Sequence, residues 1–196
     1  KPFKTRSGEN VKLSDLLGQA VKGAEKIVEE KNAGLDDDQK RQIARSVGVG
    51  AIKYADYSNN RTSDYTFSFD RMLAMEGNTA PYMQYAYARV RSIQRKAAEK
   101  GIDYAGESAE IEKVEFSDRA EFELAKFLMR YGEVIDSAVE DFRINYLTSY
   151  LYELAGKFSG FYNACPVLGA GGKVRAVRLL LCELTARTVR HGLCEM

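Results

Sequence analysis

The fold of this chain is decided by the stretch Phe69-Asp-Arg-Met-Leu-Ala-Met-Glu-Gly-Asn-Thr-Ala-Pro-Tyr-Met-Gln-Tyr-Ala-Tyr-Ala-Arg-Val-Arg-Ser92. Its pattern predicts a short helix over 69–76, a turn at Gly77-Asn78 and a longer helix over 79–100. Pro81 lies in the first turn of the longer helix, where a missing backbone N–H costs nothing. Gly101 then ends that helix.

The longer helix carries two different faces. Tyr82, Tyr85 and Arg89 are spaced by three and four residues and therefore share one side, with Lys96 and Lys100 on the same side. Such a face can stack on unpaired bases and hold phosphates. Periodicity alone leaves open that the tyrosines are amphipathic boundary residues and the cations are solvated. The core stripe comprises Met83, Ala86, Val90, Ile93 and Ala97.

Helical patterns continue over most of the chain, and prolines are few. The pattern over 36–56 places Ile43, Val47, Ala51 and Tyr54 inward. Residues 102–116 are acidic and read as an exposed, irregular connection. The fold class predicted is all-α, a helical bundle. The other helices are expected over 14–31, from Asp118 onward with a capping box to Glu121, over 133–163 with a break near Gly156 or Gly160, and over 174–192.

Composition narrows the class of protein. The chain has 196 residues, 45% of them hydrophobic and 29% charged, with a net charge of +1. A charge this small draws no nucleic acid by a global field, so any such contact must come from local patches. No run is long enough to span a membrane. Three cysteines without a CxxC pair favour a reduced, cytoplasmic location, and the single histidine, His191, argues against a histidine-based metal site.

No catalytic constellation is visible. The chain has no Walker loop and no GxGxxG, and its carboxylates are too scattered to name a pair. We therefore predict no catalytic residue here. Near the end of the chain, Tyr162 lies where a helix ends and offers an edge that can stack on a base. The arginines of the last helix, Arg175, Arg178, Arg187 and Arg190, either meet phosphates or form a solvated face.

Several ordered blocks resemble one family, the class I arginyl-tRNA synthetases. The strongest runs from Gly77-Asn-Thr-Ala-Pro-Tyr82 through Arg89-Val-Arg-Ser-Ile93, and it opens that family's anticodon-binding domain. Lys4-Thr-Arg-Ser-Gly8 resembles a degenerate KMSKS loop. After Gly192-Leu193 the chain departs from the family's usual, longer ending. The remaining blocks are Lys53-Tyr-Ala-Asp56, Asn60-Arg-Thr-Ser-Asp-Tyr65, Phe161-Tyr-Asn-Ala-Cys-Pro-Val167 and Arg178-Leu-Leu-Leu-Cys-Glu-Leu-Thr-Ala-Arg187.

The resemblance implies a function and a division of the chain. Residues 1–62 would be the end of a catalytic half, and 63–196 an anticodon-binding bundle. Tyr82, Tyr85, Arg89, Tyr162 and Met196 stand at positions that contact the tRNA in the family. Lys4 and Arg6 fall in the loop that closes over ATP.

In that family the whole enzyme attaches arginine to tRNA-Arg with ATP and Mg²⁺, through a Rossmann domain that bears a HIGH motif. No HIGH motif occurs in this sequence, which begins at Lys1 rather than at Met. We therefore expect a piece of a longer protein that binds no cofactor and forms no arginyl-tRNA alone. The expected state is a monomer with no membrane partner. The alternatives are a free-standing helical RNA-binding module and a protein-interaction module.

Overall fold

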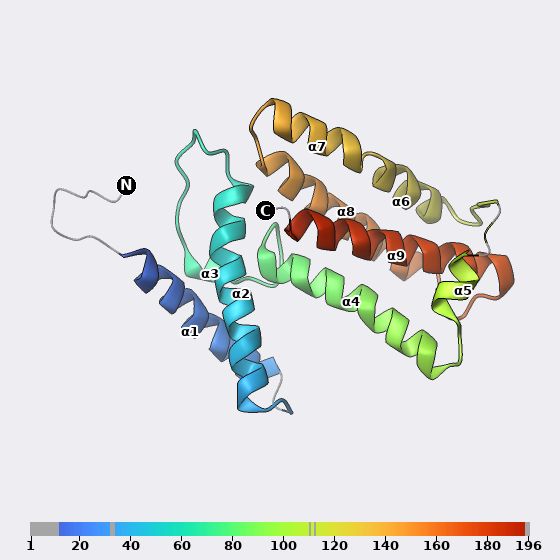
Figure 1. Cartoon of the computed structure of the whole chain (residues 1–196), viewed down its shortest axis with the longest axis horizontal. Helices are drawn as coiled ribbons and strands as arrows, with labels where there is room; N and C mark the ends of the chain where they lie inside the picture. Colours follow the sequence, from blue (N-terminus) through green and yellow to red (C-terminus); the bar gives the residue numbers. More distant parts are fainter. Residues whose placement is uncertain (1–11, 32–33, 110, 112, 195–196) are drawn as a thin grey trace. The chain divides into compact units, whose positions relative to one another are not determined.

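The computed structural model describes residues 12–31, 34–109, 111 and 113–194, and the regular structure within them is entirely α-helical (Figure 1). This confirms the predicted fold class. The chain divides into two compact units, Lys1–Gln84 and Tyr85–Met196, and α4 runs through the division. The helices are α1 (Leu13–Lys31), α2 (Asp37–Ser58), α3 (Phe69–Met72), α4 (Ala80–Glu99), α5 (Tyr104–Ala109), α6 (Arg119–Met129), α7 (Tyr131–Glu140), α8 (Asn145–Ala164) and α9 (Gly172–Cys194).

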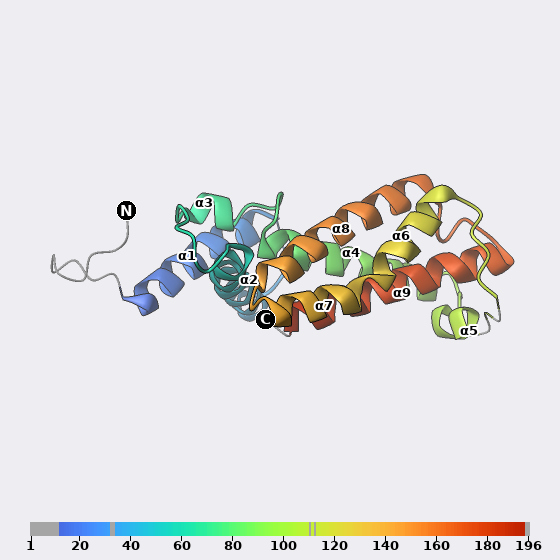
Figure 2. The ribbon, with the colours of Figure 1, turned by 90° about the horizontal axis from the view of Figure 1, so that it is seen from above.

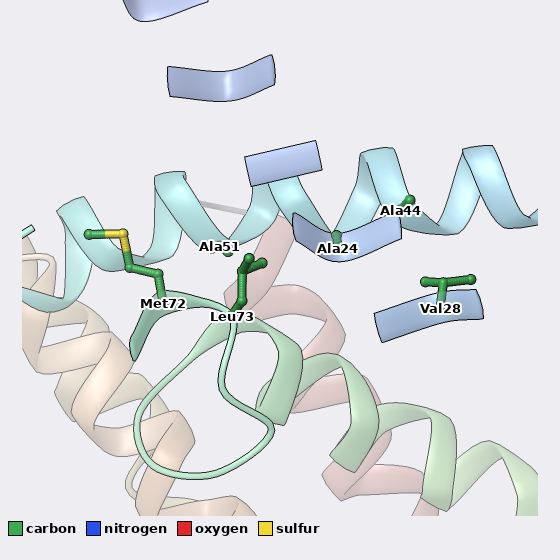
Figure 3. Packing of buried hydrophobic residues seen from close by; sticks show 6 residues of the cluster. All are labelled: Ala24, Val28, Ala44, Ala51, Met72 and Leu73. Atoms are coloured by element: carbon green, nitrogen blue, oxygen red, sulfur yellow. The ribbon is translucent and has the colours of Figure 1, made fainter. Parts of the chain in front are cut away.

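In the first unit, α1 and α2 pack through small side chains. Ala24 and Ala44 are fully buried, and Ala51 is 1% exposed. Figure 3 shows them together with Val28 and with Leu73, which follows α3. The predicted inward position of Ile43 is wrong, because its side chain is 37% exposed. A close approach of two helices selects small residues for the seam and leaves a branched side chain at its edge.

Gly48 lies at the closest point of this seam. A Cβ atom on Gly48 would stand 2.7 Å from the backbone N and Cα of Val21 on α1. The neighbour is backbone, so it cannot rotate away as a flexible side chain could. Gly18, also helical, has no such neighbour within 4 Å.

We expect Gly48→Ala to destabilise the first unit by about 1–3 kcal/mol, because the added methyl forces α1 and α2 apart. Gly18→Ala is the matched control, and it should stabilise α1 by about 0.5–1 kcal/mol through helix propensity alone. Denaturant unfolding followed by helical circular dichroism measures both. Equal effects of the two substitutions would contradict the close approach.

The second unit is an antiparallel bundle. Figures 1 and 2 show α8 running one way while α6, α7 and α9 run the other. Phe158 and Phe161 of α8 are 1% and 0% exposed, so both are core residues. Tyr150 of α8 stacks on Phe127 of α6 with ring centroids 4.8 Å apart, and its hydroxyl donates to the Phe127 carbonyl at 3.1 Å.

The single helix predicted over 133–163 is wrong in one respect. The chain breaks between α7 and α8, not at Gly156 or Gly160, which both lie inside α8. Phe142 takes a left-handed backbone conformation with φ 53°, and Arg143 N–H donates to the Ala138 carbonyl at 2.9 Å. This is the helix ending that glycine usually makes, so the sequence carried no signal for it.

Residues 102–116 also differ from the prediction, because they include α5. Asp103 Oδ1 accepts from the Gly106 N–H at 3.0 Å, and Tyr104 donates its hydroxyl to the Leu179 carbonyl of α9 at 3.0 Å. A helix this short is marginal by itself, so packing on α9 stabilises it. The short helix expected over 69–76 is likewise only Phe69–Met72.

Candidate nucleic-acid interface

Helix α4 has the two faces that its sequence indicates. Met83, Val90, Ile93 and Ala97 of the predicted core stripe are at most 1% exposed, whereas Ala86, its fifth member, is only half-buried. On the other side, Tyr85 is 51% exposed. An aromatic ring half in solvent on a helix whose opposite side is largely buried is available to a ligand without disturbing the core.

Arg89, one turn beyond Tyr85, lies against α8. Its guanidinium carbon stands 4.8 Å from the centroid of the Tyr162 ring, and its Nη1 lies 3.5 Å from Ser159 Oγ. The cation–π contact holds the planar guanidinium against one face of the ring. The structure thus brings together Arg89 and Tyr162, which are far apart in the sequence.

Ser159 is a residue that sequence reasoning missed. It precedes Tyr162 by three residues on α8, so the two side chains share a helix face. That spacing is the signal that could have found it once Tyr162 was chosen.

The start of α4 belongs to the first unit, and two hydrogen bonds within that unit hold it in place. Thr79 Oγ1 accepts from the Tyr82 N–H at 3.3 Å, which caps the helix. Tyr54 of α2, 3% exposed, donates its hydroxyl to Asn78 Oδ1 at 2.7 Å. Burial raises the pKa of Tyr54, so this hydroxyl stays a donor. Tyr82 itself is half-buried and lies one turn before Tyr85 on the same helix.

Three of the residues named from the sequence, Lys4, Arg6 and Met196, lie outside the described residues. Their parts in ATP or RNA binding stay predictions.

The arginines of α9 are mostly engaged with carboxylates. Arg175 forms a two-pronged pair with Glu107 of α5, at 2.8 and 2.6 Å. Arg187 Nε lies 2.7 Å from Glu183 Oε1. On α4, Arg91 also approaches Glu183, at 3.6 Å, and bonds to the Tyr87 hydroxyl at 2.9 Å. Arg175 and Arg91 are thus paired at half-buried positions, whereas Arg187 is paired but its side chain is 72% exposed.

Arg178 is largely buried and is not part of a solvated face. Its side chain is 11% exposed and its Nε lies 2.6 Å from Oε1 of Glu121, whose side chain is 1% exposed. Arg178 also donates to the Pro166 carbonyl at 2.9 Å. Glu121 accepts from the Ser117 N–H at 2.7 Å and, as predicted, from the N–H of Asp118, which caps α6.

Two effects on the pKa of Glu121 oppose each other. Burial raises it, while the bonds from Arg178 and Ser117 lower it, and the bonds prevail. The folded chain therefore holds the ionised carboxylate more tightly than the unfolded chain does. The resulting stabilisation is present above the usual pKa of 4.5 and is lost as the pH falls through the lower, folded value.

We expect Glu121→Gln to destabilise the second unit by about 3 kcal/mol at neutral pH, because Arg178 loses its buried counter-charge. The difference in the free energy of unfolding from the unsubstituted chain should shrink below pH 4.5, because Glu121 stabilises the unsubstituted chain less as its carboxylate becomes protonated. Denaturant unfolding at neutral pH and at several acidic values measures this. Glu123→Gln, on the same helix but 43% exposed, is the control and should change little. A difference that stays constant in acid would contradict the assignment.

Other sites are less promising. Burial raises the pKa of the Cys182 thiol to about 12, which makes it unreactive at neutral pH. Within the described residues, no group of histidines, cysteines and carboxylates could hold a metal ion. Over the same residues, no helix is long and apolar enough to cross a membrane. A hollow of about 360 Å³ among α6, α7 and α8 is lined by residues such as Val134 and Tyr146, and by none of the candidates above.

Residues 83–194 match the DALR anticodon-binding domain, and residues 1–69 match the catalytic domain of class I tRNA synthetases of the arginine type. The first match covers more than half of the chain. The chain belongs to the DALR anticodon-binding domain family.

Similar proteins agree with this assignment. The arginine–tRNA ligase of Chromobacterium violaceum is 52% identical over 193 residues, which are 98% of this chain and 32% of that protein. The chain thus spans about a third of the length of the curated relatives it matches. Among solved structures, Thermus thermophilus arginyl-tRNA synthetase superposes with a TM-score of 0.80 at 32% identity, over 94% of this chain and 31% of that one. The Plasmodium falciparum enzyme gives 0.81 at 28% identity, over 93% and 32%.

Proposed function

We propose that this chain is the tRNA-binding portion of an arginine–tRNA ligase and that it recognises the anticodon loop of tRNA-Arg. The observation that carries the proposal is the exposed Tyr85 beside the Arg89–Tyr162 pair, within a domain of the anticodon-binding family. Tyr82 and Met196 complete the set of residues proposed to contact the RNA.

The chemistry of this face suits unpaired bases. Tyr85 offers a flat ring on which a base stacks, with about 1–3 kcal/mol per base. The guanidinium of Arg89 covers one face of Tyr162 and is only half-buried, so we propose that the guanidinium also stacks on a base or binds a phosphate. Because Ser159 and Tyr162 hold Arg89 in place, little side-chain entropy remains to be lost on binding.

The remaining steps of arginylation belong to the longer protein of which we propose this chain is a part. Its catalytic domain would use arginine and ATP with Mg²⁺, and Lys4 and Arg6 would approach the ATP phosphates. We keep residues 1–62 as the proposed end of that catalytic half and 63–196 as the anticodon-binding bundle. The compact units divide after Gln84, and the family matches leave residues 70–82 between them. We further propose a cytoplasmic monomer.

Selective binding of tRNA-Arg tests the proposed function. Since the net charge is only +1, non-specific attraction is weak and recognition must come from the local face. We expect tRNA-Arg to bind more tightly than non-cognate tRNA, in titrations at low and at physiological salt. Equal affinity for any RNA would indicate a generic RNA-binding module, and no binding at all would favour a protein-interaction module.

Removing the Tyr85 ring should separate binding from folding. We expect Tyr85→Ala to weaken tRNA binding by about 1–3 kcal/mol and to leave the melting temperature nearly unchanged, because the ring is 51% exposed. Val90→Asp, at a position 1% exposed, should instead unfold the second unit and lose binding only as a consequence. The measurements are tRNA affinity and thermal melting of both variants. If Tyr85→Ala melts the chain as severely as Val90→Asp, the tyrosine is a core residue.

A further inference from the structure

The outer face of α4 continues beyond Arg89 as a line of positive charge. At about 100° per residue, Lys96 and Lys100 fall within about 20° of Arg89 around the helix axis. With a rise of about 1.5 Å per residue, the line extends about 16 Å from Arg89. Both lysines are exposed, and Lys100 follows the last residue of the helix.

These lysines differ from four arginines of the same unit. Arg91, Arg175, Arg178 and Arg187 each lie against a carboxylate, whereas within the described residues no carboxylate forms an ion pair with Lys96 or Lys100. The acidic residues nearest in sequence, Glu99 and Asp103, are exposed and make no ion pair with them in the part of the chain that the structure describes. Carboxylates thus neutralise those four arginines, while the charge of Lys96 and Lys100 is not neutralised by an ion pair within the described residues.

We propose that Lys96 and Lys100 continue the RNA-binding face as a phosphate track, which binds the sugar–phosphate backbone next to the bases that meet Tyr85 and Arg89. This inference rests on the proposed function and adds to it the part of the RNA that these residues bind. A lysine ammonium group is a point charge on a flexible side chain, so it binds phosphates without distinguishing one base from another. The track therefore supplies affinity and register, and the aromatic face supplies selectivity.

The salt dependence of binding tests the track. Each phosphate contact contributes about 0.7 to the slope of log affinity against log salt for single strands, and about 0.9 for duplexes. We expect the double variant Lys96→Gln/Lys100→Gln of the full chain to bind tRNA-Arg with a slope smaller by about 1.4. Its loss of affinity relative to the unsubstituted chain should then shrink about sevenfold between 50 and 200 mM salt. Cognate and non-cognate tRNA should lose affinity equally.

Three controls make the result specific. Lys96→Arg/Lys100→Arg keeps the charge and should keep the slope. Arg95→Gln removes one charge from an exposed position of the same helix, about 120° away from the line, and should leave the slope unchanged. Lys113→Gln removes the charge of a lysine that is already paired with Glu115 at 2.9 Å, and it should also leave the slope unchanged.

The outcomes separate this inference from the proposed function. Basic residues near a helix C-terminus also stabilise the helix, so melting temperatures accompany each titration. If the unsubstituted chain binds tRNA-Arg selectively but the lysine double variant keeps its slope, the track is overturned and the proposed function stands. A change as large per charge in Arg95→Gln would mean diffuse attraction and would also overturn the track. If the unsubstituted chain binds no tRNA, the proposed function fails and the track with it.

Discussion

The Glu121 carboxylate joins three separate parts of the second unit. It accepts from the backbone ahead of α6, pairs with Arg178 of α9, and through Arg178 reaches the Pro166 carbonyl between α8 and α9. A carboxylate 1% exposed is tolerated only because charged and backbone donors surround it. The bundle around α8 therefore depends on a pair that is costly to break from either side.

The pairing of each arginine determines the charge of the α4 surface. Carboxylates neutralise Arg91 and Arg178 within the fold. Arg89 is held by an aromatic ring and a hydroxyl instead, and both leave its charge uncompensated. An uncompensated guanidinium at a half-buried position, next to the exposed ring of Tyr85, supports the RNA-binding face proposed above.

Close packing plays the corresponding role in the first unit. Ala24, Ala44 and Gly48 let α1 and α2 approach closely. At Gly48 no room remains for a Cβ atom beside the α1 backbone. From α2, the Tyr54 hydroxyl reaches Asn78 in the turn where α4 begins. The turn that starts the helix with the candidate interface is thus held by a buried hydroxyl rather than by its own sequence alone.

The sequence by itself determined the local features: the capping box at Asp118, the two faces of α4, and the end of α4 just before Gly101, whose φ is 68°. Each depends on neighbours within a few residues, which periodicity and capping rules can read. Tertiary structure alone decided the break at Phe142, the pairing of Arg178 with Glu121, and the meeting of Arg89 with Tyr162. These depend on residues brought together from distant positions, or on strain that packing elsewhere offsets, and no local pattern encodes either.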